Sequence, residues 1–192
     1  SVLNRLTKAG VLVENALFAT LDPTVRGHHT PDGRDYTIAD TVGFVRSLPH
    51  QLVEAFRSTL EEISHADLIV HIVDATDPDP MGQIRTVHEV IAEVDGSAIE
   101  ELIVFNKIDL VNQMPSEEES MHISEHELQE TRYVDFKALS DAYEKKNGIK
   151  PVFMAAASAE NVEEFRSALV AEVKKQHRKI YPHYLEDEIV DW

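Results

Sequence analysis

In LIVFNKID, residues 102 to 109, four apolar residues are followed directly by the tetrapeptide Asn-Lys-Ile-Asp. A short, continuous apolar run of this kind is typical of a strand that is buried on both faces of a sheet. Similar runs lie at Leu68 to Asp74 and Val152 to Ala155, and helical patterns separate the three runs. Strands that alternate with helices predict an α/β fold, with a mostly parallel sheet and helices on both faces.

The flanking segments complete the predicted architecture. Residues 25 to 41 predict two short strands around the turn Pro31-Asp32-Gly33, which would give the sheet one antiparallel edge strand. Helical spacing recurs in residues 1 to 8, in residues 50 to 65, and in a last helix marked by Phe165, Leu169 and Val173.

These elements predict a single domain over residues 1 to 178, followed over 179 to 192 by a tail or the start of a truncated element. Between residues 111 and 150 the chain is acidic and irregular. We expect a solvated helix, loop and helix in this segment, with an interaction insert as the alternative.

Charge narrows the classes of partner. The chain carries a formal net charge of −17, all of it contributed by residues 61 to 192. Because an acidic surface repels nucleic acid, we expect no DNA partner, and contact with an RNA-rich partner would use the first third of the chain. Seven basic and histidine residues cluster there, and an ordinary solvated surface explains them at least as well: Arg26, His28, His29, Arg34, Arg46, His50 and Arg57.

Composition also bears on location. Cysteine is absent, which excludes disulfides, zinc–thiolate sites and thiol catalysis. The apolar runs fall well short of the roughly 20 residues that span a bilayer. We therefore expect a monomeric cytoplasmic protein without a membrane span.

The tetrapeptide Asn106-Lys107-Ile108-Asp109 follows a strand at the edge where open α/β sheets present ligands. The Asp109 carboxylate can accept two hydrogen bonds from the ring N–H and amino group of guanine, a pair that adenine does not offer. Asn106 can bond the guanine edge and tie neighbouring loops, while the aliphatic stem of Lys107 can lie over the base. Alone, the tetrapeptide could simply end a strand in a turn, so its weight depends on the other motifs.

A second motif, Asp40-Thr41-Val42-Gly43, ends the second strand of the predicted hairpin. Asp40 is suited to holding a water bound to Mg²⁺. Gly43 lets a backbone N–H approach a terminal phosphate, because no Cβ stands in the way. A turn of this composition is common, and its value lies in its place before the apolar strands and Asn-Lys-Ile-Asp.

The loop Phe18-Ala19-Thr20-Leu21-Asp22 lies upstream of the hairpin. A hydroxyl there can complete the coordination of Mg²⁺ and let the loop close on the γ-phosphate of a triphosphate. Thr20 is the first candidate and Thr24 the second. A helix cap or a turn is the alternative role for a threonine in such a loop.

Together these segments resemble the HflX family of ribosome-associated GTPases. The resemblance runs through NALFATLDPT at residues 15 to 24, DTVGFV at 40 to 45, LPH at 48 to 50 and LVEAFRSTL at 52 to 60. It covers most of residues 1 to 110, far more than a generic GTPase signature.

The resemblance implies the G domain of a P-loop NTPase that binds GTP or GDP with Mg²⁺ and acts on the ribosome, through its large subunit. By that resemblance Thr20 matches the Mg²⁺-contacting threonine of the first switch. Residues 18 to 22 and 40 to 43 would surround the phosphates, and residues 106 to 109 would bind the base.

The start of the chain departs from the family pattern. GTPases of this kind carry Gly-x-x-x-x-Gly-Lys-Ser before the first helix, and an asparagine of that helix usually stands four residues after the serine. Asn4 is three residues after Ser1, so Ser1 matches the residue that follows the serine. The backbone N–H groups and lysine of that loop provide much of the phosphate binding. We therefore expect a chain that begins just after its P-loop and binds nucleotide poorly alone.

The guanine-side loop departs in a second way. Relatives carry Ser-Ala-Lys there, and this chain offers Ser158-Ala159 by identity. Loop length instead favours an earlier register around Ala155 to Ala157. Because a backbone N–H can serve in either register, Ala156, Ala157 and Ser158 all remain candidates.

The implied reaction is hydrolysis of GTP by in-line attack of water on the γ-phosphate, helped by Thr20 and the backbone of Gly43. Many GTPases orient that water with a glutamine just after Asp-x-x-Gly, where this chain has Phe44. A phenyl ring cannot hydrogen-bond the water, so we expect slow intrinsic turnover and a group supplied by a partner or another loop. The alternative is an interaction module that keeps the fold and binds no nucleotide.

The histidines do not predict a further metal site. His65, His71 and His88 lack the spacing of metal ligands, and His122 and His126 lack the glutamate of a zinc-protease helix. From the sequence we expect no zinc.

Overall fold

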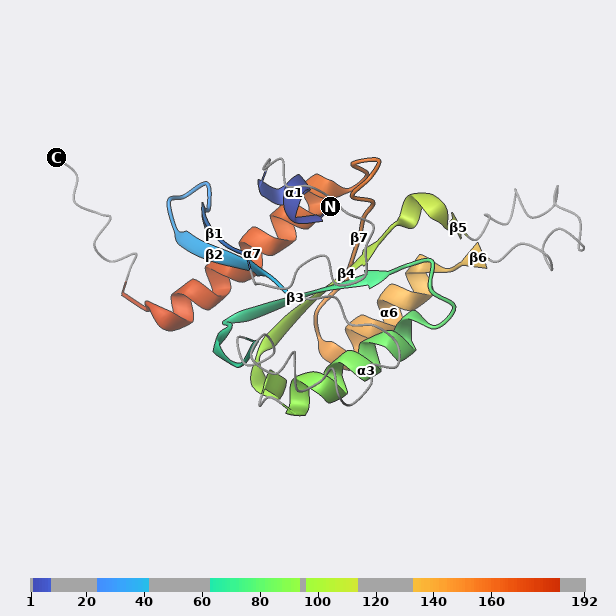
Figure 1. Cartoon of the computed structure of the whole chain (residues 1–192), viewed down its shortest axis with the longest axis horizontal. Helices are drawn as coiled ribbons and strands as arrows, with labels where there is room; N and C mark the ends of the chain where they lie inside the picture. Colours follow the sequence, from blue (N-terminus) through green and yellow to red (C-terminus); the bar gives the residue numbers. More distant parts are fainter. Residues whose placement is uncertain (1, 8–23, 42–62, 94–95, 114–132, 184–192) are drawn as a thin grey trace, which may run out of the picture.

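The computed structural model describes residues 2–7, 24–41, 63–93, 96–113 and 133–183. Its centre is a parallel sheet with the strand order β3-β4-β7 (Figure 1). The strands are β3 (Leu68–Asp74), β4 (Glu100–Asn106) and β7 (Val152–Phe153). Strands β3 and β4 pair along their whole length, so that their last residues, Asp74 and Asn106, are register partners.

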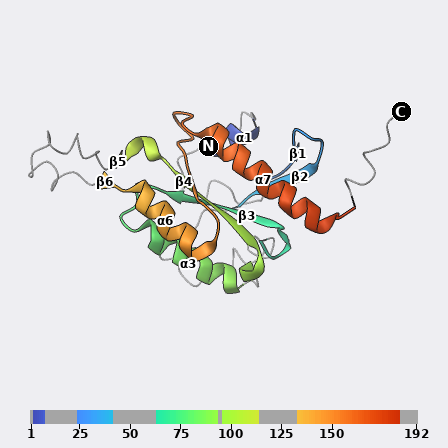
Figure 2. The same ribbon diagram turned by 180° about the vertical axis from the view of Figure 1, so that it is seen from behind.

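Helices cover both faces of this sheet (Figures 1 and 2). Helices α3 (Pro80–Glu93) and α6 (Phe136–Asn147) lie on one face. Helix α7 (Val162–Ile180) and the short α1 (Val2–Thr7) lie on the other. This arrangement confirms the α/β class and the covered sheet that the alternating pattern predicts.

Strand β4 supplies both halves of the core, because successive side chains of a strand point to opposite faces. Leu102 and Val104 pack with the α7 residues Phe165 and Leu169, whereas Phe105 joins the cluster under α3 and α6. All five side chains are at most 4% exposed. The run from Leu102 to Phe105 is therefore continuously apolar because both of its faces are buried.

Strands β1 (Thr24–His29) and β2 (Asp35–Asp40) form the antiparallel pair predicted for residues 25 to 41. Gly33 has a φ of +83° and donates its N–H to the carbonyl of Thr30, which closes the turn. In the described residues this pair is a sheet of its own, separate from the parallel strands. Tyr36 and Ile38 nevertheless pack against the core under α7.

Arg34 does not belong to the basic surface that composition suggested. Its side chain is buried and forms an ion pair with Asp32, which also lies 3.2 Å from Lys174 Nζ on α7. A guanidinium in that position anchors the hairpin and cannot reach a phosphate. Arg46, His50 and Arg57 lie outside the described residues.

The described parts of the acidic segment between residues 111 and 150, which are 111–113 and 133–150, are less solvated than composition suggests. A short parallel pair joins β5 (Asn112–Gln113) to β6 (Tyr133–Val134). Helix α6 follows, capped by the Asp135 carboxylate, which accepts the N–H of Ala138 at 2.8 Å. Tyr143 on α6 is only 2% exposed, so this helix belongs to the core. The apolar residues of α6 are spaced as in an amphipathic helix, but the many charged residues around them favoured the prediction of a solvated segment.

Three 3-10 turns complete the described chain: η1 (Ile63–His65), η2 (Gly96–Ala98) and η3 (Ile108–Leu110). Most of the helix predicted for residues 50 to 65 lies outside the described residues, and its last three residues form η1. No helix among the described residues is long and apolar enough to cross a membrane.

Candidate nucleotide-binding site

Three loops meet at the carboxyl edge of the parallel sheet, where open α/β folds bind ligands. They follow Asp74 at the end of β3, Asn106 at the end of β4, and Phe153 at the end of β7. Backbone hydrogen bonds join them: Ala75 donates to the carbonyl of Asn106 at 2.9 Å, and Met154 donates to that of Phe105 at 2.8 Å. Backbone hydrogen bonds therefore join these loops at the edge of the sheet.

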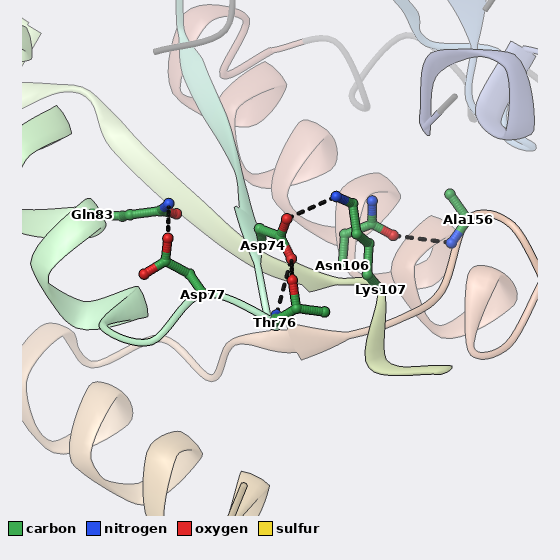
Figure 3. Close-up of polar contacts among 7 residues, drawn as sticks. All are labelled: Asp74, Thr76, Asp77, Gln83, Asn106, Lys107 and Ala156. Atoms are coloured by element: carbon green, nitrogen blue, oxygen red, sulfur yellow. Dashed lines mark hydrogen bonds and ion pairs between the residues drawn. The ribbon is translucent and has the colours of Figure 1, made fainter. Parts of the chain in front are cut away.

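Asn106 fixes two of these loops relative to each other. Its side chain is buried, and its Oδ1 accepts the backbone N–H of Ala156 at 3.0 Å (Figure 3). Ala156 is itself only 4% exposed, so its amide depends on this protein partner. The prediction that Asn106 ties neighbouring loops is confirmed. Ala157 and Ser158 follow directly and are exposed.

Lys107 adopts a left-handed conformation, with a φ of 68°, which is uncommon for a residue other than glycine. Several bonds hold it there. Ile108 donates its N–H to the carbonyl of Met154 at 3.3 Å, and Lys107 Nζ contacts Asp74 Oδ2 at 2.7 Å. The turn buries Ile108 and leaves Asp109 exposed, so the Asp109 carboxylate is accessible to a ligand. Strained backbone of this kind is typical of binding sites.

Asp74 is a residue of this edge that sequence reasoning missed. Its Oδ1 accepts both the N–H and the hydroxyl of Thr76, at 2.9 and 2.7 Å, while Oδ2 faces Lys107 (Figure 3). Burial raises the pKa of the Asp74 carboxyl, but hydrogen bonds from Lys107 and Thr76 outweigh burial and lower that pKa below its ordinary value. The sequence did hold a signal, because Asp74 ends an apolar strand just as Asn106 ends the next.

Arg5 supports the guanine-side loop from the opposite side. Its guanidinium donates to the carbonyls of Ala156 and Ala157, at 2.6 and 2.7 Å. Arg166 on α7 in turn donates to the carbonyl of Arg5. These contacts could not be predicted from sequence, because α1 and the loop are about 150 residues apart along the chain.

Asp40 is the last residue of β2 in the antiparallel pair, and Thr41 follows it. A cavity of about 1770 Å³ lies between β2 and β3, and its lining includes Asp40, Thr41 and Asp74. Within the described residues, Asn106 to Asp109 and Ala156 to Ser158 do not line this cavity. Asp74 links the two regions, because it lines the cavity and also contacts Lys107.

The remaining candidates lie outside the described residues. On the phosphate side these are Phe18, Ala19, Thr20, Leu21, Asp22, Val42 and Gly43, together with Phe44. Their expected roles stay predictions.

The α/β sheet, with a strand that ends in Asn-Lys-Ile-Asp and is tied to the next loop, defines a GTPase domain of the P-loop class. A model of the family described as "50S ribosome-binding GTPase" matches residues 1–107, more than half of the chain. The chain belongs to this family, as an HflX-type GTPase.

Curated relatives carry the same name. GTPase HflX of Caldanaerobacter subterraneus is 49% identical over 116 residues, covering 60% of this chain and 27% of that protein. The Escherichia coli HflX is 45% identical over 111 residues, covering 58% and 26%. The Flavobacterium psychrophilum HflX is 32% identical over 184 residues, covering 95% and 43%. This chain therefore spans less than half of the length of each of these relatives.

Solved structures share the fold. A variant of SsGBP superposes with a TM-score of 0.67 at 20% identity, over 94% of this chain and 52% of that one. Era, in complex with MgGDPNP and nucleotides of 16S ribosomal RNA, gives a TM-score of 0.57 at 19% identity, over 88% and 51%. At these identities the likeness supports the fold alone.

Proposed function

We propose that this chain is the G domain, over residues 1 to 178, of a cytoplasmic GTPase that binds GTP and GDP and hydrolyses GTP. The observation that carries the proposal is the bond from the Ala156 amide to Asn106, beside an exposed Asp109. This hydrogen bond holds the loop after β4 and the loop after β7 in place around a position where a planar base can bind. Preset loops bind more tightly, because little ordering remains to be done on binding.

Guanine selectivity would come from Asp109. Its exposed carboxylate can accept both donors of the guanine edge, and hydrogen bonds to a charged acceptor are each worth about 1.5–3 kcal/mol. Lys107 is anchored at its ammonium group by Asp74, which leaves its aliphatic stem to pack on the base. The bond from Ala156 to Asn106 favours the earlier register of the guanine-side loop.

The residues present also fit Mg²⁺. Hard divalent cations prefer carboxylate and hydroxyl oxygens, and Asp40 offers a half-buried carboxylate at the cavity between β2 and β3. Bound Mg²⁺ would neutralise charge on the phosphates. Asp40 would hold one of its waters, Thr20 would contribute a hydroxyl, and the N–H of Gly43 would hydrogen-bond the γ-phosphate.

Base recognition is tested by Asp109→Asn in the complete protein. The substitution replaces an acceptor with an amide, so it should lower the affinity for GTP by roughly 100-fold, equivalent to about 2.7 kcal/mol. Xanthosine triphosphate, which presents a carbonyl where guanine has its amino group, should gain affinity. Asp141→Asn is the matched control, because Asp141 is exposed on α6.

Equal competition by ATP and GTP, or equal loss in the two variants, would contradict guanine recognition by Asp109. A complete protein that binds no nucleotide at all would instead support the interaction module.

We further propose that the complete protein acts on the ribosome through the large subunit. The family description supports this proposal. Of the two described arginines in the basic group predicted from composition, Arg26 is partly exposed, whereas Arg34 is buried. Co-sedimentation with separated subunits, in GDP and in a non-hydrolysable GTP analogue, tests it. Binding to the small subunit alone, or to neither, would refute it.

A further inference from the structure

A second group of ionisable side chains lies beneath α3 and α6, away from the candidate nucleotide site. It consists of His71 on β3, His88 on α3 and Glu101 on β4. His71 Nδ1 lies 2.8 Å from Glu101 Oε1, and His88 Nε2 lies 2.7 Å from Glu101 Oε2. Glu101 is roughly 16 Å along β4 from Asn106, at about 3.3 Å per residue.

The fold brings these residues together, although they are far apart in sequence. In the parallel register His71 pairs with Ile103 and Ile69 pairs with Glu101, so His71 and Glu101 share one face of the sheet. His88 reaches them from α3, which packs on that face. Because each ligand comes from a different element, the spacing of the histidines along the chain could not predict the cluster.

We propose that His71, His88 and Glu101 form a binding site for a divalent transition-metal ion, with Zn²⁺ as the best match. Two imidazoles and a carboxylate are a ligand set that zinc uses with three protein ligands, leaving a fourth position for water. Imidazole nitrogen favours zinc over Mg²⁺ and Ca²⁺, which prefer oxygen alone. The site is therefore chemically different from the Mg²⁺ position assigned to the phosphate side.

The geometry is close to what such an ion needs. Tetrahedral zinc, with bonds of about 2.0–2.1 Å, holds its ligand atoms roughly 3.3 Å apart. One ligand atom from each of the three residues lies within 4.8 Å of the others, so shifts of about 1 Å suffice. The side chains of His71 and Glu101 are 9% and 13% exposed and that of His88 is 38% exposed, which gives the ion a route from solvent.

Neighbouring side chains orient the Glu101 carboxylate for metal binding. Without metal, Glu101 accepts hydrogen bonds from both imidazoles, and metal binding would replace the protons on those two nitrogens. The Tyr143 hydroxyl donates to Glu101 Oε2 at 3.3 Å and would stay as an outer partner that orients the carboxylate. Burial raises the pKa of Tyr143 above its ordinary value, so the phenol remains a donor.

The test is a titration of the untagged 192-residue chain with Zn²⁺ and Co²⁺, in excess Mg²⁺ and without nucleotide. Calorimetry should give one zinc ion per chain, and Co²⁺ should give the visible absorption of a tetrahedral complex. His88→Gln should lower the affinity at least tenfold and remove that absorption. Glu101→Gln, which keeps the shape of the side chain, should do the same.

His29→Gln is the matched control. His29 also pairs with a carboxylate, that of Asp35, but at an exposed position on the hairpin, and the described residues supply no third ligand there. This variant should bind zinc like the unmodified chain. Circular dichroism and thermal melting check that each variant is folded.

Absence of one-to-one zinc binding would overturn the proposal. Unchanged affinity in folded His88→Gln, or an equal loss in His29→Gln, would also overturn it and leave the cluster as an ion-paired network. Since no nucleotide is present in the titration, this outcome is independent of whether the chain binds GTP.

Discussion

Asn106→Ala should destabilise the protein through a single lost hydrogen bond. The side chain is 8% exposed, and its Oδ1 accepts the N–H of Ala156, a residue that is 4% exposed. Alanine offers no acceptor, and water has little access to the orphaned amide. Leaving a buried donor unsatisfied costs about 1–3 kcal/mol of unfolding free energy. For a chain of this size that corresponds to a fall in melting temperature of roughly 2–12 °C.

Urea denaturation measures the loss, and amide hydrogen exchange localises it. The N–H of Ala156 should exchange faster in the variant, whereas amides in the middle of α7 should change only with global stability. Ser167→Ala is the matched control. Its hydroxyl donates to the carbonyl of Glu163 at 2.9 Å, a bond of similar length on the exposed face of α7. Removing it should change the unfolding free energy by less than about 0.5 kcal/mol.

The reasoning fails if Asn106→Ala and Ser167→Ala have the same unfolding free energy. It also fails if the Ala156 amide exchanges at the same rate in the variant and in the unmodified protein. Either result would mean that the loop after β7 does not depend on Asn106.

Three further perturbations follow from the same structure. Phe165→Ala empties the centre of the core under α7 and should lower the unfolding free energy by about 3–5 kcal/mol in urea titrations; a loss below about 1 kcal/mol would contradict the packing. Arg5→Met keeps the aliphatic chain but removes both bonds to the carbonyls of Ala156 and Ala157, so hydrogen exchange in that loop should accelerate, and unchanged exchange would argue against the anchor. Asp74 has a lowered pKa in the folded state, so its stabilising contribution is present above its ordinary value of 3.8 and is lost as the pH falls through the lower folded value. Asp74→Asn should therefore weaken the acid-induced fall in urea midpoint below pH 3.8, and identical acid profiles for the two proteins would contradict this.

Several features were predictable because they depend on local pattern. The run before Asn106 is short and continuously apolar, since both of its faces are buried, and its alternation with helical patterns predicts a strand of a covered parallel sheet. The turn at Gly33 needs a positive φ, which glycine adopts without strain. The apolar spacing of Phe165 and Leu169 on α7 predicts an amphipathic helix in the same way.

Other features could not be predicted, because they depend on contacts between distant segments. The charged composition of residues 111 to 150 predicted a solvated segment, but α6 contributes to the core through Tyr143, which is buried. Arg34 was expected at the surface, but the hairpin folds it inward beside Asp32. Arg5 meets the guanine-side loop only because α1 and α7 share a face of the sheet.

Short stretches such as residues 102 to 109 predict the α/β class and the side chains suited to a guanine nucleotide, because strand burial and hydrogen-bonding chemistry depend on local residues. Which side chains lie together depends on strand pairing, which appears only in the folded chain. The parallel register sets Asp74 beside Asn106 and gathers His71 with Glu101. Strand pairing brings together residues that no spacing along the chain connects, and this is why the contact of Asp74 with Lys107 and the cluster of His71, His88 and Glu101 became visible only in the folded protein.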